Sequence, residues 1–238
     1  MKLAEEKLIL RPIRAESDQL ANPKTIWEDS QSDLKLQILY PDMFANERAR
    51  DAGDQNSTST IVSLVCGSGC VLLPGDSTIH AWRELAQESQ LLPIRADVIA
   101  MPHHGGLLGE NQSDVDWFLS SAVNPDFAVL SVGTSNQYGH PRPEVTRSLR
   151  NAGVKILCTQ ITKQCSGDLE SIRPGVLPIL NPGNSSRVRD LTHSGRSRRV
   201  ACAGTIVAEL HKNGDVAVMR EDLHRSEVVR KVSKPLCS

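Results

Sequence analysis

The sequence predicts a layered α/β fold, and three observations carry this prediction. Apolar residues first recur at helical spacing and then form a strand-like run, at Ile79, Trp82, Leu85 and Ala86 and at residues 98–101. The same alternation of helix and strand returns further along the chain. Glycine and proline mark the junctions between these segments. Because each helix and each strand must bury an apolar face, this alternation is typical of helices packed on a sheet.

The N-terminal part of the chain predicts one strand and one hairpin. Residues 1–33 are polar and weakly periodic, and residues 34–38 then alternate as in a half-buried strand. Residues 42–58 predict a polar loop. Two β-rich runs follow, at residues 61–66 and 70–73, and their three-residue connection contains two glycines. Such a connection is typical of a β-hairpin.

Helix and strand alternate twice more after residue 101. Ser113 and Asp116 resemble a capping box that opens a helix through Trp117 and Phe118. Residues 127–132 predict the next buried strand. Pro143 opens a further helix, Gly153 ends it, and residues 154–158 predict another strand.

The C-terminal part predicts an insertion followed by a hairpin. Residues 166–199 are rich in Ser, Gly, Pro and Arg and lack an apolar period. Asn213-Gly214 then joins two strand-like runs, at residues 205–210 and 216–219. We therefore divide the chain into a polar N-terminal segment with the first strand (1–55), a central half-domain (56–160) and a C-terminal extension with an Arg-rich loop and the hairpin (161–238).

Composition excludes several classes of protein. The chain has 238 residues, enough for one or two domains with a buried core. Apolar residues at 39% and charged residues at 23% exclude a wholly disordered chain. Three Phe, three Trp and two Tyr are too few for a base-stacking groove, and a net charge of -1 gives no overall attraction to nucleic acid. Any recognition of phosphate must therefore be local.

The sequence also predicts the compartment. The N-terminal residues lack the apolar core and cleavage site of a signal peptide, and no apolar run approaches the ~20 residues that span a bilayer. We therefore expect a cytoplasmic protein with no membrane partner. Six cysteines in a reducing compartment are more typical of thiols or metal ligands than of disulfides.

Polar clusters follow three of the predicted strands. They are Gly75-Asp76, the segment Pro102-His103-His104-Gly105-Gly106 and residues 136–141, which include His140. The ends of strands in an α/β protein are places where loops can aim side chains at a common point. Imidazole and carboxylate groups together suit zinc, manganese or iron.

In this order, the clusters resemble a known pattern. Residues 56–159 look like the second half of a metallo-β-lactamase-fold domain of the ComEC competence-protein type. The matching segments are SLV (63–65), VLLPGD (71–76), ADVIAMPHHGG (96–106), VLSVG (129–133) and Asn136 with YGHP (138–141). They fall in the order that the family's fold requires.

The resemblance implies an αββα sandwich, of which this chain would carry the C-terminal half, followed by an extra hairpin and helix. It also implies that one or two Zn²⁺ or Mn²⁺ ions activate water to hydrolyse a phosphodiester. In such a site Asp76 would bridge the ions and His140 would ligate the second. His103 or His104 would bind metal or stabilise the phosphate; we assign His103 to the metal and Asp76 and His104 to catalysis.

The sequence departs from the pattern in its first part. The family's His-x-His-x-Asp-His motif is absent, and the first histidine is His80. Residues 1–55 are too short for the first half of the sandwich, which takes on the order of 100 residues. Three explanations stay open: a reading frame that begins late, a second chain that supplies the missing half, or a metal-poor relic used for binding. We expect the chain alone to bind metal poorly.

A missing half would leave one face of the sheet without its cover. We place Ile61, Val65, Leu72 and Val129 on that face. A partner chain, self-association, or the N-terminal segment and C-terminal extension could each cover it. We expect association, because residues 1–55 are polar and short.

The remaining histidines and the arginine-rich loop have simpler interpretations. His80, His193, His211 and His224 are expected at the surface. The loop forms either a phosphate-facing surface or a solvated insertion, with basic residues at Arg187, Arg189, Arg196, Arg198 and Arg199.

The cysteines fall into two groups. Cys66 and Cys70 flank the first hairpin connection and are expected to be small buried thiols. The second group lies in the C-terminal third and is a candidate structural zinc site, made of Cys158, Cys165, Cys202 and Cys237. These residues lack the Cys-x-x-Cys spacing typical of such sites.

Taken together, the sequence predicts a metal-dependent hydrolase of the metallo-β-lactamase superfamily, with a phosphodiesterase or nuclease-like activity on a nucleic acid or nucleotide. The alternative is a catalytically silent binding or assembly subunit with a partial metallo-β-lactamase fold. The partners that follow are a chain that supplies the first half of the fold and a second copy of this chain.

Overall fold

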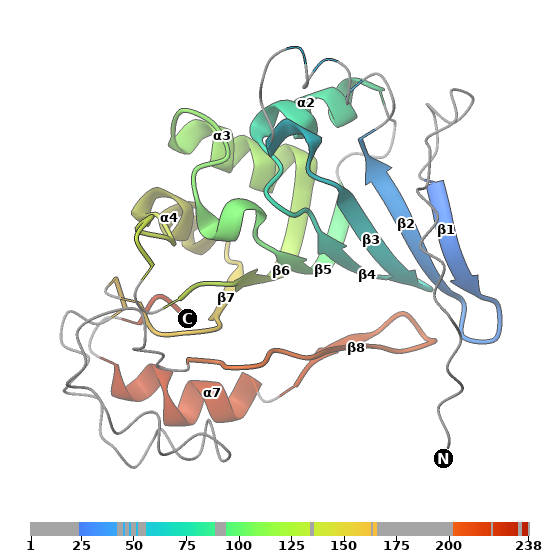
Figure 1. Ribbon diagram of the computed structural model, residues 1–238. Helices are drawn as coiled ribbons and strands as arrows, with labels where there is room; N and C mark the ends of the chain where they lie inside the picture. The colour runs from blue at the N-terminus through green and yellow to red at the C-terminus, as the bar shows by residue number, and fades with distance from the viewer. Residues whose placement is uncertain are drawn as a thin grey trace.

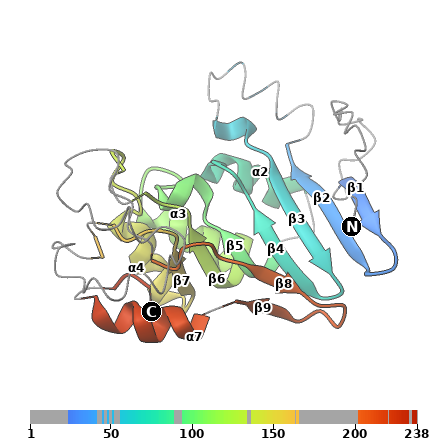
Figure 2. The same ribbon diagram turned by 60° about the horizontal axis from the view of Figure 1, so that its bottom comes forward.

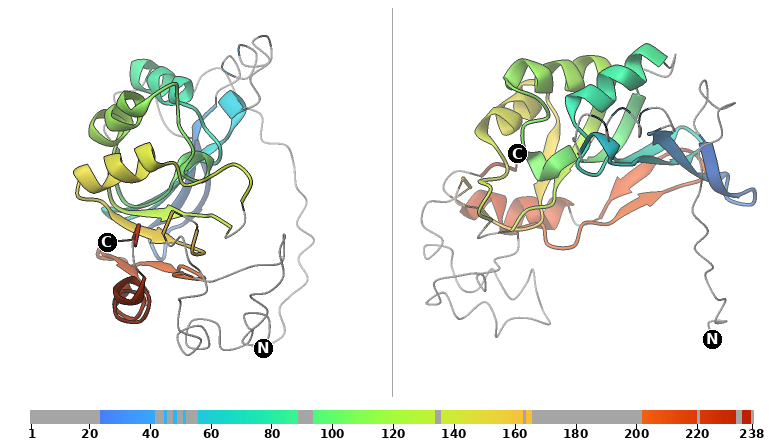
Figure 3. Two further views of the ribbon diagram at one scale, coloured as in Figure 1. Left: turned by 90° about the vertical axis from the view of Figure 1, so that its left-hand side faces the viewer. Right: turned by 45° about the horizontal axis from the view of Figure 1, so that its top comes forward.

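A computed structural model describes residues 24–41, 45, 48, 51, 56–88, 94–133, 136–162, 164–165, 202–219, 221–232 and 235–237. In this part of the chain, a seven-stranded sheet carries helices on one face, and a C-terminal hairpin and helix lie on the other (Figures 1 and 2). Two further views show the same division (Figure 3). The predicted α/β class is confirmed, whereas the complete αββα sandwich stays a prediction.

The strands of the sheet lie in chain order. They are β1 (Lys24–Asp29), β2 (Leu34–Tyr40), β3 (Ile61–Cys66), β4 (Gly69–Leu73), β5 (Ile94–Ala100), β6 (Val123–Leu130) and β7 (Lys155–Cys158). Strands β1 to β4 pair antiparallel, and β4 to β7 pair parallel. The parallel half is the region in which the sequence alternates between strand and helix.

Helices connect the parallel strands on one face of the sheet. They are α2 (Ile79–Glu88), α3 (Gln112–Trp117) with a π-helical turn (Phe118–Ala122), and α4 (Pro143–Asn151). Short 3-10 helices occupy Asn56–Thr58, Pro102–Gly105 and Val229–Lys231. Parallel crossovers are right-handed, and the strands advance in one direction across the sheet, so every crossover helix lies on the same face.

The core lies between this face and the helices. Trp82 and Phe118 are fully buried and meet edge to face, with ring centroids 4.9 Å apart. The indole Nε1 of Trp82 donates to Ser77 Oγ at 3.0 Å, which satisfies the only polar atom of that side chain. Leu72 and Ile99 supply the sheet side of the same core.

Three details differ from the sequence prediction. Strand β1 was not predicted; it is an edge strand of mainly polar residues in which Trp27 is exposed. Asn111, not Ser113, caps helix α3, because the extended Asn111 accepts the amide of Ser113 through its side chain. Gly69 pairs with Cys66 in the ladder, so the first hairpin turn is one residue shorter than expected.

The face away from the helices carries a second row of apolar side chains. The ladder pairs Leu64 with Val71, Val71 with Val98, and Val98 with Phe127, and paired residues project to the same face. Val129 lies on this face as predicted, two residues after Phe127.

The prediction that Ile61, Val65 and Leu72 lie on the same face is wrong. Ile61 and Leu72 belong to the core beneath the helices, and Val65 packs against it. Since side chains alternate along a strand, an error of one residue moves each side chain to the opposite face.

The C-terminal extension covers part of this second face. Strand β8 (Ala208–Leu210) pairs with β9 (Val216–Val218), and the hairpin lies against β4 (Figures 1 and 2). A Cβ on Gly69 would lie 2.9 Å from a methyl carbon of Val216, so strand and hairpin are in close contact. Helix α7 (Glu221–Glu227) follows, and Lys155 Nζ lies 3.0 Å from Glu221.

Two further predictions concern the arginine-rich loop and membrane-spanning segments. The arginine-rich loop at residues 187–199 lies outside the described residues. Among the helices of the described ranges, none is both long and apolar enough to cross a membrane.

A first test addresses the assignment of faces in β4. Leu72→Ala should lower the free energy of unfolding by about 2–5 kcal/mol, because it opens a cavity beneath the helices. Leu73→Ala, at a position 42% exposed, should cost less than about 1 kcal/mol. Denaturant unfolding of the two variants measures both values. Equal losses would contradict the assignment.

A second test addresses association of the chain. Large apolar side chains stay exposed at Leu73, Val207 and Met219. We therefore expect the chain to associate with itself as its concentration rises. Sedimentation velocity should show a mass above that of one chain. A single-chain mass at high concentration would instead mean that the C-terminal extension is a sufficient cover.

Candidate metal centre at the carboxyl ends of the parallel strands

The loops that follow β4, β5 and β6 meet at one edge of the sheet. The His103 amide donates to Gly75 O at 3.1 Å, and the Arg142 amide donates to Gly105 O at 2.9 Å. These bonds tie the loop after β5 to its neighbours on both sides. The parallel direction of the strands therefore brings the predicted site residues to a common edge.

Four predicted site residues form two close pairs at this edge. His104 Nε2 lies 3.6 Å from Asp76 Oδ1, and both side chains are about half exposed. The rings of His103 and His140 meet edge to face, with centroids 5.2 Å apart. The exposed ring of Tyr138 stacks on His140 at 5.9 Å. Asp76 thus lies close to His104, and His103 close to His140, whereas the closer approach of Asp76 and His140 that a shared metal cluster requires stays a prediction.

The backbone of the histidine pair is strained. His103 and His104 have φ values of 51° and 55°, and Gly105 follows with a φ of 81°. The left-handed region costs residues with a side chain of order 1–3 kcal/mol, and such residues cluster at functional sites. Two left-handed histidines in succession are therefore a local cost that the surrounding structure has to offset.

Asn136 holds the loop that carries His140. Its side-chain oxygen accepts the His140 amide at 2.7 Å, and its Nδ2 donates to both Gly133 O and His140 O at 2.8 Å. The His140–Pro141 peptide bond is cis. One amide side chain thus fixes the backbone on both sides of the loop.

The imidazole of His140 has an unused nitrogen. Its Nδ1 is buried and has no hydrogen-bond partner, which is uncommon for a buried polar atom. Burial lowers the pKa of His140, and the neighbouring His103 lowers it further. The neutral ring, which carries a free lone pair, is therefore the favoured form at neutral pH.

These donors suit a metal ion but form an open set. Carboxylate and neutral imidazole are ligands for Zn²⁺ and Mn²⁺, and the buried Nδ1 of His140 lacks any other partner. Within the described ranges, however, the one group with three donor atoms all within 4.8 Å of one another lies elsewhere, at Cys202, His224 and Cys237. The strand-edge site therefore needs further donors to hold an ion firmly.

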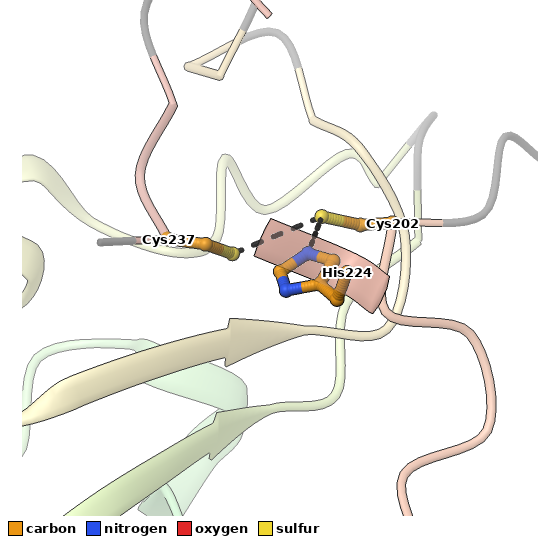
Figure 4. A group of neighbouring side chains, drawn as sticks. All are labelled: Cys202, His224 and Cys237. Atoms are coloured by element: carbon orange, nitrogen blue, oxygen red, sulfur yellow. Dashed lines mark hydrogen bonds between the residues drawn. The ribbon is translucent and has the colours of Figure 1, made fainter. Parts of the chain in front are cut away.

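The second group lies beyond the carboxyl end of β7, at the same edge of the sheet, where the C-terminal extension meets this strand (Figure 4). Cys202 Sγ lies 3.1 Å from His224 Nε2 and 3.8 Å from Cys237 Sγ. The Cys158 amide donates to Cys237 Sγ at 3.3 Å. All four cysteines of the candidate structural zinc site are buried.

His224 corrects the sequence interpretation. The prediction placed it at the surface, whereas it is only 5% exposed and contacts Cys202. It lies on α7, among polar residues, and no local pattern marks it as buried. His80 and His211 are exposed as predicted, and His193 lies outside the described residues.

Hydrogen bonds among the thiols divide them into donors and acceptors. A bond from Cys158 lowers the pKa of Cys165 to about 6, and bonds from Cys158 and Cys202 lower the pKa of Cys237 well below its usual value. The pKa values of Cys158 and Cys202 are raised by the same thiol contacts and by burial. The cluster thus favours thiolates next to thiols.

The remaining cysteines lie apart from both sites. Cys66 and Cys70 are buried, as expected. Cys66 Sγ donates to Ser32 O at 3.1 Å. Burial, together with the nearby Asp97, raises the pKa of Cys70 to about 11. These two residues are small buried thiols of the sheet.

A third test addresses the packing of the strand-edge histidines. A Cβ at position 106 would lie 2.8 Å from His140 Cε1 and 3.1 Å from His103 Cγ, and the backbone there is ordinary, with φ of -69°. Gly106→Ala should therefore displace both rings and cost about 1–3 kcal/mol of stability. Histidine ring resonances in NMR spectra should shift. Gly133→Ala is the control, since nothing lies within 4 Å of its added Cβ.

Comparison with known proteins finds part of the chain similar to competence proteins. No family model matches, and no solved structure matches. The chain is 31% identical over 109 residues to "Competence protein ComA" of Neisseria gonorrhoeae and 28% identical over 130 residues to "ComE operon protein 3" of Bacillus subtilis (strain 168). These matches cover 46% and 53% of this chain but 15% of each relative. Over about half of its length, the chain is thus similar to competence proteins.

Proposed function

We propose that the strand-edge residues form part of the site of a metal-dependent phosphodiesterase that acts on DNA. The observation that carries this proposal is the buried, unpartnered Nδ1 of His140, beside the ring of His103. A buried imidazole nitrogen without a partner has lost its contact with water and gained nothing in return. A metal ion would supply the missing contact.

The chain's own residues have distinct parts in this proposal. Asp76 offers carboxylate oxygens, and His103 and His140 offer neutral imidazole nitrogens, so these three would hold Zn²⁺ or Mn²⁺. An ion bound there would lower the pKa of a bound water and neutralise charge on the phosphate. Asn136 keeps the His140 backbone in place, which orients the ring.

His104 has a separate part as an acid or phosphate contact. It is 55% exposed, and its Nε2 lies 3.6 Å from Asp76 Oδ1. In this position Nε2 lies beside a carboxylate, and the ring is open to solvent, from which substrate arrives. His104 is therefore suited to contact a phosphate oxygen or to donate a proton to a leaving oxygen.

The substrate class rests on the relatives and on charge. The similarity to competence proteins supports a role connected with DNA uptake. The net charge of -1 provides no general attraction to nucleic acid, so recognition has to come from the strand-edge loops. A phosphodiester is the group in DNA that such a site would contact.

The open donor set supports a further part of the proposal. None of the strand-edge residues belongs to a close three-donor group among the described residues. We assign the additional ligands to a His-x-His-x-Asp-His segment outside this sequence, on a longer form of this chain or on a partner chain. In that arrangement both halves would supply ligands, and full activity would require both.

A fourth test measures hydrolysis by the purified chain. With Mn²⁺ and a fluorescently labelled single-stranded oligonucleotide, we expect weak cleavage, because the ligand set is incomplete. Asp76→Asn and His140→Ala should each reduce cleavage to the level of the metal-free protein. His80→Ala, which removes an exposed histidine on α2, should leave the rate unchanged.

Three outcomes would change the proposal. Strong Mn²⁺-dependent cleavage that Asp76→Asn abolishes would show that the chain holds a complete site and needs no partner. Cleavage that persists in the double variant Asp76→Asn/His140→Ala would locate the chemistry outside these residues. No metal-dependent cleavage at all would favour the binding or assembly subunit, which the open donor set equally allows.

A further inference from the structure

We infer that Cys202, His224 and Cys237 bind a structural zinc ion that fastens the C-terminal extension to the edge of the sheet. The inference is independent of the proposed hydrolase, because it uses other residues at another place. The three donors come from three segments: the chain before β8, helix α7 and the last described residues. Figure 4 shows their side chains pointing toward one another.

The distances agree with tetrahedral zinc. Zn–S bonds of about 2.3 Å at a tetrahedral angle place two sulfur atoms about 3.8 Å apart. Cys202 Sγ and Cys237 Sγ are 3.8 Å apart. A sulfur and an imidazole nitrogen would be about 3.6 Å apart in the same geometry, and the observed 3.1 Å requires only a small movement of His224.

The chemistry of the donors selects zinc. Two thiolates and an imidazole are a ligand combination found in structural zinc sites, whereas Mn²⁺ and Mg²⁺ prefer oxygen. The three side chains are only 4%, 5% and 3% exposed, in the order Cys202, His224 and Cys237. Burial of all three donors favours a structural ion, provided that a fourth protein ligand closes the tetrahedron.

One of two neighbouring thiols would complete the tetrahedron. Cys158 lies at the end of β7, and its amide already donates to Cys237 Sγ. Cys165 lines a small apolar cavity together with Cys202 and Cys237. Either sulfur could close the site by a side-chain rotation, and the other would stay next to it as a thiol.

A disulfide fits this cluster less well. A disulfide requires two sulfur atoms about 2.05 Å apart, whereas Cys202 and Cys237 are 3.8 Å apart with His224 against one of them. A pairing of two cysteines would also leave His224 buried without a partner for its Nε2. A zinc ion uses all three groups.

The ion would add to the hydrogen bonds that already join these segments. The Cys202 amide donates to Thr159 O, and the Ala203 amide donates to the oxygen of Cys158, the last residue of β7. At the C-terminal end, Arg150 Nη2 donates to Pro235 O at 2.6 Å. Zinc would join both contacts to α7 at one point, which anchors the hairpin across the second face of the sheet.

The experiment is a measurement of bound zinc in the full chain. Protein purified under reducing conditions without added metal should contain about one zinc ion per chain, as measured by inductively coupled plasma mass spectrometry. Cys202→Ser and His224→Ala should lose most of it. His224→Cys should retain it, because a thiolate can replace imidazole in a tetrahedral site. Cys66→Ala, which removes a buried thiol outside the cluster, is the matched control.

Cobalt substitution tests the geometry and identifies the fourth ligand. Co²⁺ in place of zinc should show the visible absorption of a tetrahedral ion and a thiolate charge-transfer band. Cys158→Ser and Cys165→Ser each remove one candidate for the fourth ligand. The variant that removes the true ligand should lower the intensity of both absorption bands, and the other variant should leave them unchanged. Spectra that stay unchanged in both single variants and in the double variant Cys158→Ser/Cys165→Ser would mean that the fourth ligand is water, which contradicts a closed structural site.

Several results would overturn the inference. Wild-type protein without zinc, or zinc retained in both Cys202→Ser and His224→Ala, would show that the cluster is only a packed thiol core. A Cys202–Cys237 disulfide in the reduced preparation would also overturn the inference, because its sulfur atoms would not be thiolate ligands. Asp76→Asn should keep its zinc whatever its effect on DNA cleavage, so the two proposals fail separately.

Discussion

The constraint on which this structure depends is that its sheet has two apolar faces, while its crossover helices can cover only one. The parallel strands β4 to β7 lie in chain order, and right-handed crossovers then place every crossover helix on the same side. Val71, Val98 and Phe127 remain on the other side, and the C-terminal hairpin covers part of that row. A two-stranded hairpin is marginally stable by itself, so its position depends on the segments that anchor it.

The same parallel arrangement creates the candidate metal centre. Strands that run in one direction end at one edge, so Asp76 meets His104 and His103 meets His140, although the partners in each pair are far apart in sequence. The rigid sheet and helices supply the support that allows His103 and His104 to keep a left-handed backbone. The packing of the helices on one face and the position of the candidate site are therefore linked, because the helices that stabilise the sheet also fix the loops that carry the site.

The sequence predicted the elements with strong local signals and missed those decided by distant contacts. Pro143 and Gly153 mark the two ends of a helix, and α4 with β7 lies where they indicate. Strand β1 has no apolar alternation of its own and exists because β2 offers it an edge. His224 sits among polar neighbours, and only contacts with residues 22 positions away show that it is buried. The proposed roles of the strand-edge residues rest on the chemistry of their side chains. These roles also require further metal ligands that do not belong to the strand-edge residues.

The two donor groups differ in the metals that they can hold, which allows both to operate in one molecule. The cluster at the C-terminal extension offers soft sulfur ligands in a buried site, where zinc binds far more tightly than manganese. The strand edge offers oxygen and nitrogen donors close to solvent, and under the proposed function its open set would exchange ions and admit substrate. A zinc ion that anchors the extension would therefore leave the strand edge free for a different ion. In this arrangement the structural ion stabilises the cover of the sheet, and the sheet in turn presents the loops on which hydrolysis would depend.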